Sequence, residues 1–200
     1  AVAFYVSSSE AMMRFIFGNS MVFIVLILAE LGLVFAISGM INKMSAGTAT
    51  SLFVLYSALN GVTLSFIFLA YTSTSIASTF FICGGTFVAC SIYGWTTKKD
   101  LTSMGGFLTM GLIGIIIASL VNMFIRSSAM NMIISYIGVI VFVGLTAYDT
   151  QKLKNMAMTQ PAGEDGAVIR KGAILGALSL YLDFINLFLM LLRIFGQGRD

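Results

Sequence analysis

Three acidic residues lie within apolar stretches of this sequence, where an ionised side chain is costly. Glu30 lies in the stretch 27–33, Asp183 in the stretch 180–186, and Asp149 near the end of a third stretch. A charged group at the centre of a membrane helix costs about 2.5–3.5 kcal/mol, so it must face a cavity or a partner. Two carboxyl groups that share one proton titrate as a unit. Asp149 and Asp183 are therefore candidates for a proton sensor in a sequence without histidine.

Each acid also has an interpretation that requires no function. Asp149 can form an interfacial ion pair with Lys152, and Glu30 can be a protonated group that is hydrogen-bonded to a neighbouring helix. Asp183 is the hardest to explain in this way, because its surroundings are apolar and its nearest polar neighbour, Asn186, is neutral.

Asparagines within the apolar stretches are a second set of candidates. Asn60 and Asn186 are predicted to line an ion pathway together with the acids. The alternative, which is the more usual one in membrane helices, is hydrogen bonding between helices, and it applies to Asn122 as well.

The composition indicates that membrane helices position these residues. Of 200 residues, 58% are hydrophobic and 10% are charged, and the mean hydropathy is +0.99. A soluble domain carries about 25% charged residues. This excludes an ordinary soluble enzyme, a nucleic-acid-binding domain and a disordered chain.

The pattern predicts an all-α, polytopic membrane protein with one integral membrane domain over residues 1–200. A span needs about 20 apolar residues, and the runs are continuous, as in helices, rather than alternating, as in barrel strands. We interpret residues 1–7 as the stub of a first helix, whose beginning precedes this sequence. Six more helices are predicted at residues 20–41, 49–71, 76–96, 101–125, 129–154 and 168–195. The connection 155–171, which contains Pro161, Glu164 and Asp165, is predicted to be a loop.

Helix geometry gives a depth for each acid. Glu30 and Asp183 lie about 15 Å and 16 Å into their stretches, near the middle of a core about 30 Å thick. Asp149 lies near one end of its helix, so Asp149 and Asp183 would not touch. The depth of Asp183 is counted from Gly172, where the last apolar stretch begins. Either the last helix begins before Gly172 or a polar cavity enters from the cytoplasm. We favour the earlier start, because residues 167–169 can continue the helix.

The basic residues predict an orientation. Counted by alternate connections, seven of the 11 fall on one side: Lys43, Lys98, Lys99, Lys152, Lys154, Arg170 and Lys171. Arg14, Arg126, Arg193 and Arg199 fall on the other side. The richer side is expected to be cytoplasmic, which places the N-terminus inside and the C-terminus outside.

The two cysteines are expected to be free. Cys83 and Cys90 are seven residues apart in one apolar stretch, so two turns of helix separate them by about 10 Å. This distance is beyond the reach of a disulfide.

Two motifs resemble those of the transmembrane Bax inhibitor motif family. They are YIGVIVFVGLTAYDTQK at residues 136–152 and LSLYLDFINLF at residues 178–188, and each places an acid in an apolar helix. The resemblance extends over the chain from Phe17 onward and is closest to the bacterial branch. It implies seven helices with the last one central, and a pH-sensitive calcium leak.

The resemblance also implies roles for particular residues. Asp149 and Asp183 match a hydrogen-bonded aspartate pair that senses pH, and this pair would hold calcium weakly. Glu30 matches a glutamate on the pore path. Some relatives have an arginine that latches onto the aspartate pair, but this chain has none between residues 38 and 43. Lys43 is the candidate replacement, although lysine cannot make a bidentate contact with a carboxylate.

The function expected from these features is a pH-sensitive calcium leak in a bacterial inner membrane. Calcium takes oxygen ligands, and a few scattered acids fit passage better than storage. We expect a monomer with no enzymatic activity and no cofactor, calcium being the transported ion. The alternatives are a proton-coupled transporter and a regulatory protein that binds another membrane protein, such as a protease or a stress factor.

Overall fold

The computed structural model describes residues 1–159 and 166–199. Among these residues, six helices are long and apolar enough to cross a membrane, which agrees with an all-α polytopic membrane protein. The described chain divides into two compact units, and each is described by itself. The first comprises residues 1–73, 166–175 and 197–199, and the second comprises residues 74–159 and 176–196.

In the first unit, two short helices precede the first long one. They are α1 (Val2–Ser7) and α2 (Glu10–Phe17). The Ser9 hydroxyl accepts a hydrogen bond from the Met12 N–H, and Glu10 lies in the first turn of α2, where a helix favours negative charge. The apolar side of α2 buries Met13 and Ile16. The apolar pattern of the sequence did not predict α2.

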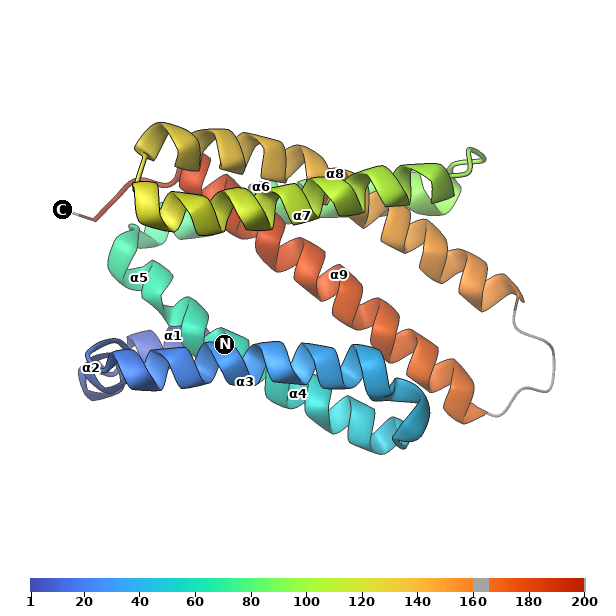
Figure 1. Cartoon of the computed structure of the whole chain (residues 1–200), viewed down its shortest axis with the longest axis horizontal. Helices are drawn as coiled ribbons and strands as arrows, with labels where there is room; N and C mark the ends of the chain where they lie inside the picture. The colour runs from blue at the N-terminus through green and yellow to red at the C-terminus, as the bar shows by residue number, and fades with distance from the viewer. Residues whose placement is uncertain (160–165, 200) are drawn as a thin grey trace. The chain divides into compact units, whose positions relative to one another are not determined.

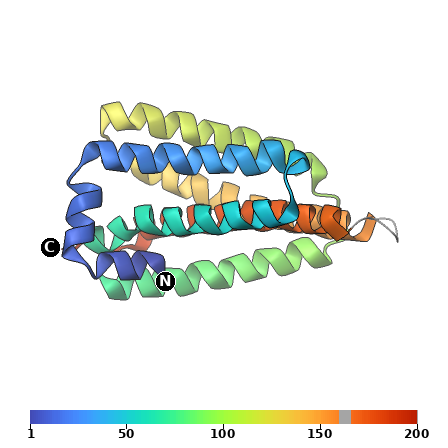
Figure 2. The same ribbon diagram turned by 90° about the horizontal axis from the view of Figure 1, so that it is seen from below.

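The α3 (Ser20–Met40) and α4 (Ala46–Thr63) helices pack side by side in the first unit (Figures 1 and 2). The short 3₁₀ turn η1 (Ile41–Lys43) joins them. After α4, a second 3₁₀ turn, η2 (Leu64–Phe66), leads into α5 (Ile67–Ala70). The predicted helix 49–71 is therefore interrupted near its end, where the Ser65 hydroxyl donates to the Val62 carbonyl at 2.6 Å.

The C-terminal tail returns to the end of α5. Tyr71 and Gly198 form an isolated antiparallel bridge, and the Arg199 backbone N–H donates to the Ala70 carbonyl at 3.1 Å. The Arg199 guanidinium donates to the Phe68 carbonyl at 2.9 Å. Two carbonyls left free at the end of a helix are thereby satisfied.

The second unit contains α6 (Ser73–Thr96), apart from its first residue, together with α7 (Thr102–Ile125), α8 (Ser128–Thr159) and the larger part of α9 (Gly166–Phe195). The α7 and α8 helices run side by side (Figure 1). Their turn contains Arg126 in the left-handed conformation, with φ of 56°. The buried Asn122 amide donates to the Ser127 carbonyl and to Asn131, so it has the hydrogen-bonding role that the sequence suggested as the alternative.

Two predicted boundaries are wrong at the connection between α8 and α9. The α8 helix continues to Thr159 rather than ending at 154, and α9 begins at Gly166 rather than at 168. Apolar runs end where the membrane ends, but a helix can continue into water. Pro161, Glu164 and Asp165 lie outside the described residues, as does Asp200.

Candidate functional site

The central feature of the second unit is a pair of carboxyl groups. A side-chain hydrogen bond joins Asp149 on α8 to Asp183 on α9. Asp183 is 5% exposed, and its Oδ2 atom is buried with no hydrogen-bond partner among the described residues. A carboxylate can only accept, so one of the two groups must carry a proton to donate.

The packing of α8 against α9 explains why the pair meets. On one side of it, a Cβ on Gly138 would lie 2.8 Å from Cγ of Met190, which shows how closely the helices approach. On the other side, Gly176 packs directly against Leu153. These contacts set an antiparallel register in which Asp149 faces Asp183. This register, rather than the earlier start of α9, brings the two aspartates together, because depths counted from the ends of apolar stretches do not report how two helices are aligned.

The surroundings of the pair are largely apolar. On the far side of α9, Phe80 and Phe87 of α6 pack edge-on against Phe184. The buried Cys83 thiol lies 3.7 Å from the Phe184 carbonyl, and both cysteines are free, as expected. The charge of Lys152 acts on Asp149, as the ion-pair interpretation required, but Asp149 also bonds to Asp183. Asp149 therefore interacts both with the positive charge of Lys152 and with the carboxyl group of Asp183.

The first unit holds a separate polar cluster around Glu30. Asn60 donates from its amide to Oε2 of Glu30 at 3.2 Å, and the Thr63 hydroxyl donates to Oε1 at 2.8 Å. Asn60 and Thr63 are three residues apart on α4, so they lie on one helix face. Thr63 was not among the residues predicted from the sequence, and its three-residue spacing from Asn60 was the signal that could have found it.

The remaining candidates have simpler surroundings. The Asn186 amide donates to the Leu182 carbonyl of its own helix at 2.8 Å. Lys43 is exposed in η1, in the first unit, whereas both aspartates belong to the second. Within the described residues there is no group of three or more acids or cysteines close enough to hold a metal ion. Calcium would therefore have at most two carboxyl groups at the aspartate pair.

The end of the second unit near the aspartates has a further polar contact that the sequence analysis missed. The buried Gln151 side chain accepts from the Leu101 N–H and donates to the Lys99 carbonyl, both at 2.8 Å. It thereby fixes the loop between α6 and α7 to α8. From the sequence, a glutamine two residues after an aspartate near the end of an apolar helix gives little indication of a buried contact, because such glutamines usually face water.

The fold and the site together define a polytopic helical membrane protein with an aspartate pair between two of its helices. Comparison with known proteins gives the family. The model of the family described as "Inhibitor of apoptosis-promoting Bax1" matches residues 1–200. The chain belongs to this Bax inhibitor family, as its two motifs suggested.

Several relatives cover nearly the whole chain. The inner membrane protein YbhL of Escherichia coli is 59% identical over 198 residues, which are 99% of this chain and 84% of that protein. An uncharacterized protein of Borreliella burgdorferi is 55% identical, over 99% of this chain and 84% of its own length. An uncharacterized membrane protein of Streptococcus pyogenes is 42% identical, over 94% of this chain and 80% of its own length.

Proposed function

We propose that this chain is a pH-dependent calcium leak of a bacterial inner membrane, and that the Asp149–Asp183 pair is its gate. The observation that carries the proposal is the side-chain hydrogen bond between two carboxyl groups on neighbouring helices. A relative named as an inner membrane protein supports the location. The chain acts as a monomer, and no enzymatic step or resident cofactor is part of the proposal.

The chemistry of the gate follows from the shared proton. When the proton is present, the hydrogen bond links α8 to α9. When it leaves, the bond is lost and two like charges stand side by side, which repel each other. A change of charge at one contact can bias a bundle between two states. The opening of the leak is thereby tied to pH through residues other than histidine.

The ion path is built from weak oxygen sites. Glu30 offers a carboxylate that two neutral side chains hold in place, and the aspartate pair offers two more oxygen-bearing groups. Calcium prefers oxygen ligands but needs six to eight of them for tight binding. Conduction requires sites weak enough to release the ion. Asn60 and Asn186 add amide groups to this path, and Lys43 is the residue we propose as the replacement for the latching arginine of some relatives.

The test is calcium flux into proteoliposomes from about pH 5 to pH 8. The wild type is expected to show a flux that varies with pH. Asp149→Asn and Asp183→Asn should each lose the pH dependence, because an amide can keep the hydrogen bond but has no proton to release in this range. Asp100→Asn is the matched control, since it removes a carboxylate from an exposed loop. It should leave the profile unchanged.

Two results would contradict the proposal. Flux no greater than in empty liposomes at every pH would exclude a leak and favour a regulatory protein that binds another membrane protein. A pH profile that survives in both aspartate variants would place the proton sensor elsewhere.

A further inference from the structure

A cavity of about 380 Å³ lies between α6, α7 and α8 in the second unit. Its walls are mostly apolar and include Ala89, Leu101, Met104 and Val143. This volume falls within the range of about 300–1,000 Å³ that is typical of sites for small molecules. The proposed function does not use this cavity.

The cavity opens toward the surface that faces lipid. Ala89 and Met104 are exposed, and so is Tyr93, another wall residue. These residues lie near the ends of helices long enough to span the bilayer, so the cavity is at the level where acyl chains meet headgroups. Tyrosine is typical of this level, because its ring is apolar and its hydroxyl is polar.

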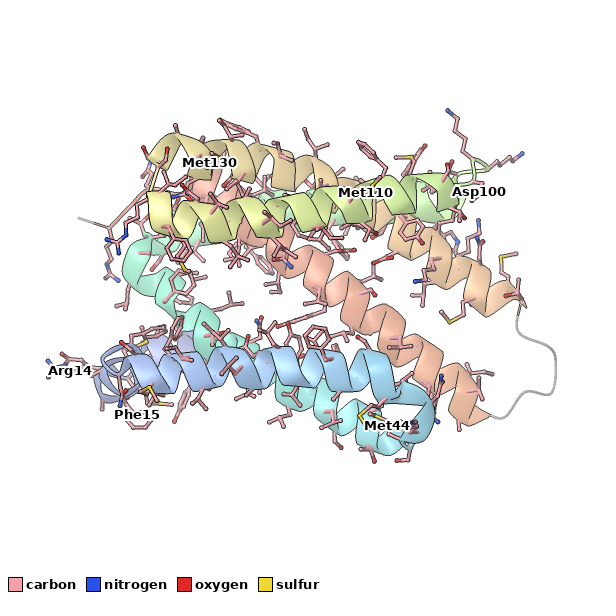
Figure 3. The ribbon with its side chains drawn as sticks, in the orientation of Figure 1. Arg14, Phe15, Met44, Asp100, Met110 and Met130 are labelled. Atoms are coloured by element: carbon pink, nitrogen blue, oxygen red, sulfur yellow. The ribbon has the colours of Figure 1, made fainter. Side chains whose placement is uncertain are left out.

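Three lysines lie close in sequence to wall residues of the cavity. Lys98 and Lys99 are exposed in the loop that precedes the wall residue Leu101, and Lys152 is exposed one turn beyond the wall residue Tyr148. Figure 3 shows nitrogen-tipped side chains around the labelled Asp100 of this loop. That aspartate is the acid of the loop and offsets only part of the positive charge.

Three hydrogen bonds fix the basic loop and the end of α8 relative to the cavity. Lys154 donates from Nζ to the Trp95 carbonyl at 2.7 Å, which ties α8 to α6. The buried Gln151 side chain bonds to the backbone on both sides of Asp100, at Lys99 and Leu101. The basic loop is thus held at the mouth of the cavity rather than left to move freely.

We propose that this cavity binds one anionic phospholipid, with an acyl chain between α6, α7 and α8 and the phosphate among Lys98, Lys99 and Lys152. The apolar walls match the chain, and the lysines complement the net negative charge that zwitterionic lipids lack. Basic pockets between membrane helices recognise anionic headgroups in this way. The site lies beside the aspartate pair in sequence, since Tyr148 precedes Asp149, but it takes a different ligand.

Cys90 provides a reporter inside the cavity. It lines the wall and is partly exposed, whereas Cys83 is fully buried and serves as an internal reference. The full chain is reconstituted into phosphatidylcholine vesicles, with or without phosphatidylglycerol of the same acyl chains. The rate of Cys90 alkylation by N-ethylmaleimide is measured by mass spectrometry. Phosphatidylglycerol should slow the labelling of Cys90 several-fold, because a bound chain covers the thiol.

Matched variants separate a bound lipid from a general surface effect. Ile92 lies on the same helix, is 58% exposed and does not line the cavity. In a Cys90→Ala/Ile92→Cys chain, the new thiol should react equally in both kinds of vesicle. The Lys99→Gln/Lys152→Gln double variant should lose the lipid effect on Cys90. The Arg170→Gln/Lys171→Gln variant, which removes the same charge from the first unit, should retain it.

Three outcomes would overturn the proposal. The first is an equal rate of Cys90 labelling with and without phosphatidylglycerol in the wild type. The second is an equal slowing at Cys90 and at the residue 92 thiol, which would indicate a surface effect. The third is a lipid effect that persists in the Lys99→Gln/Lys152→Gln variant, because the lysines would then have no part in selection.

Discussion

The hydrogen-bond partners of the intramembrane acids are neutral or acidic side chains, although the charge of Lys152 also acts on Asp149. Glu30 accepts hydrogen bonds from an amide and a hydroxyl, and Asp149 and Asp183 bond to each other. A fixed cation would hold an acid permanently ionised. At the Glu30 site both donors are neutral, and at the aspartate pair each acid has the other as its hydrogen-bond partner. The gate proposed above relies on this arrangement at the aspartate pair.

The Thr63 hydroxyl should be a measurable part of the Glu30 site. Thr63→Val removes the donor to Oε1 of Glu30 while keeping the shape of the side chain. We expect the free energy of unfolding to fall by about 1 kcal/mol, which is typical of interhelical hydrogen bonds in membranes. Thermal unfolding in detergent measures the change. Thr86→Val is the matched control, because its exposed hydroxyl donates to the Ile82 carbonyl of its own helix. An equal loss in both variants would show that the Glu30 contact has no special weight.

The sequence allowed the acids to be found but not all of their partners. Glu30, Asp149 and Asp183 stand out because they interrupt apolar stretches. The contact between the two aspartates came only from the family resemblance, because depths counted from the ends of apolar stretches separated them. Thr63 was missed because threonine in a membrane helix usually bonds its own backbone, and only the fold shows that Glu30 lies opposite.

At the scale of the elements, helix extent and close approach determine the geometry. The apolar stretches located the long helices well, because hydrocarbon requires them to be apolar. They did not locate the ends of α8 and α9, since polar residues such as Lys152 and Lys154 continue a helix outside the membrane. The short α2 was missed because its apolar face spans only two turns, although Ser9 followed by Glu10 is a recognisable helix start.

The contact between α6 and α8 depends on Gly94. A methyl group at this position would collide with the Ala147 carbonyl, and a backbone atom cannot move aside as a flexible side chain can. We expect Gly94→Ala to destabilise the protein by about 1–3 kcal/mol, as overpacking does. Thermal unfolding in detergent provides the measurement.

Gly84→Ala is the matched control for this contact. Gly84 lies in the same helix, and nothing would lie within 4 Å of its added methyl group. Alanine favours helix by up to about 1 kcal/mol over glycine. Gly84→Ala should therefore be neutral or stabilising. Unchanged stability in Gly94→Ala would mean that α6 and α8 can separate at this point without cost.

The start of α7 should respond to acid through Asp100. The hydroxyl and the backbone N–H of Thr102 donate to this carboxylate, and these hydrogen bonds lower the pKa of Asp100 from its ordinary value of 3.8. A lowered pKa means that the carboxylate supports the native loop above pH 3.8 and that this support is lost as the pH falls through the lower, native value. An NMR titration of the Asp100 carboxyl measures the shift directly.

Two variants test the cause of this shift. Thr102→Ala removes the hydroxyl donor and should move the pKa of Asp100 back toward 3.8. Asp100→Asn should remove the corresponding acid dependence of stability. A pKa of Asp100 at or above 3.8 in the native protein would show that the carboxylate accepts no hydrogen bond from Thr102.

At the scale of the whole molecule, the basic residues of alternate connections differ in number and in kind. Lysines dominate the side of the loops at Lys43, Lys98 and Lys152, whereas the other side has only arginines, among them Arg126 and Arg199. Because basic residues near the ends of spans are retained in the cytoplasm, the lysine-rich side is expected to be cytoplasmic. The proposed lipid site and the aspartate pair would then lie toward the cytoplasm.

This orientation places the C-terminus of the chain outside. Alkaline phosphatase fused to the C-terminus should therefore be active, because this enzyme matures only after export, and green fluorescent protein at the same place should be dark. The two reporters inserted into the loop at residues 97–100 should give the opposite pair of signals. Replacing Lys98, Lys99, Lys152 and Lys154 by glutamine should raise the fraction of inverted molecules, since the charge bias is then reduced. A fluorescent C-terminal fusion in the unaltered chain would reverse the assignment, and the gate would then sense the pH outside the cell instead of the pH of the cytoplasm.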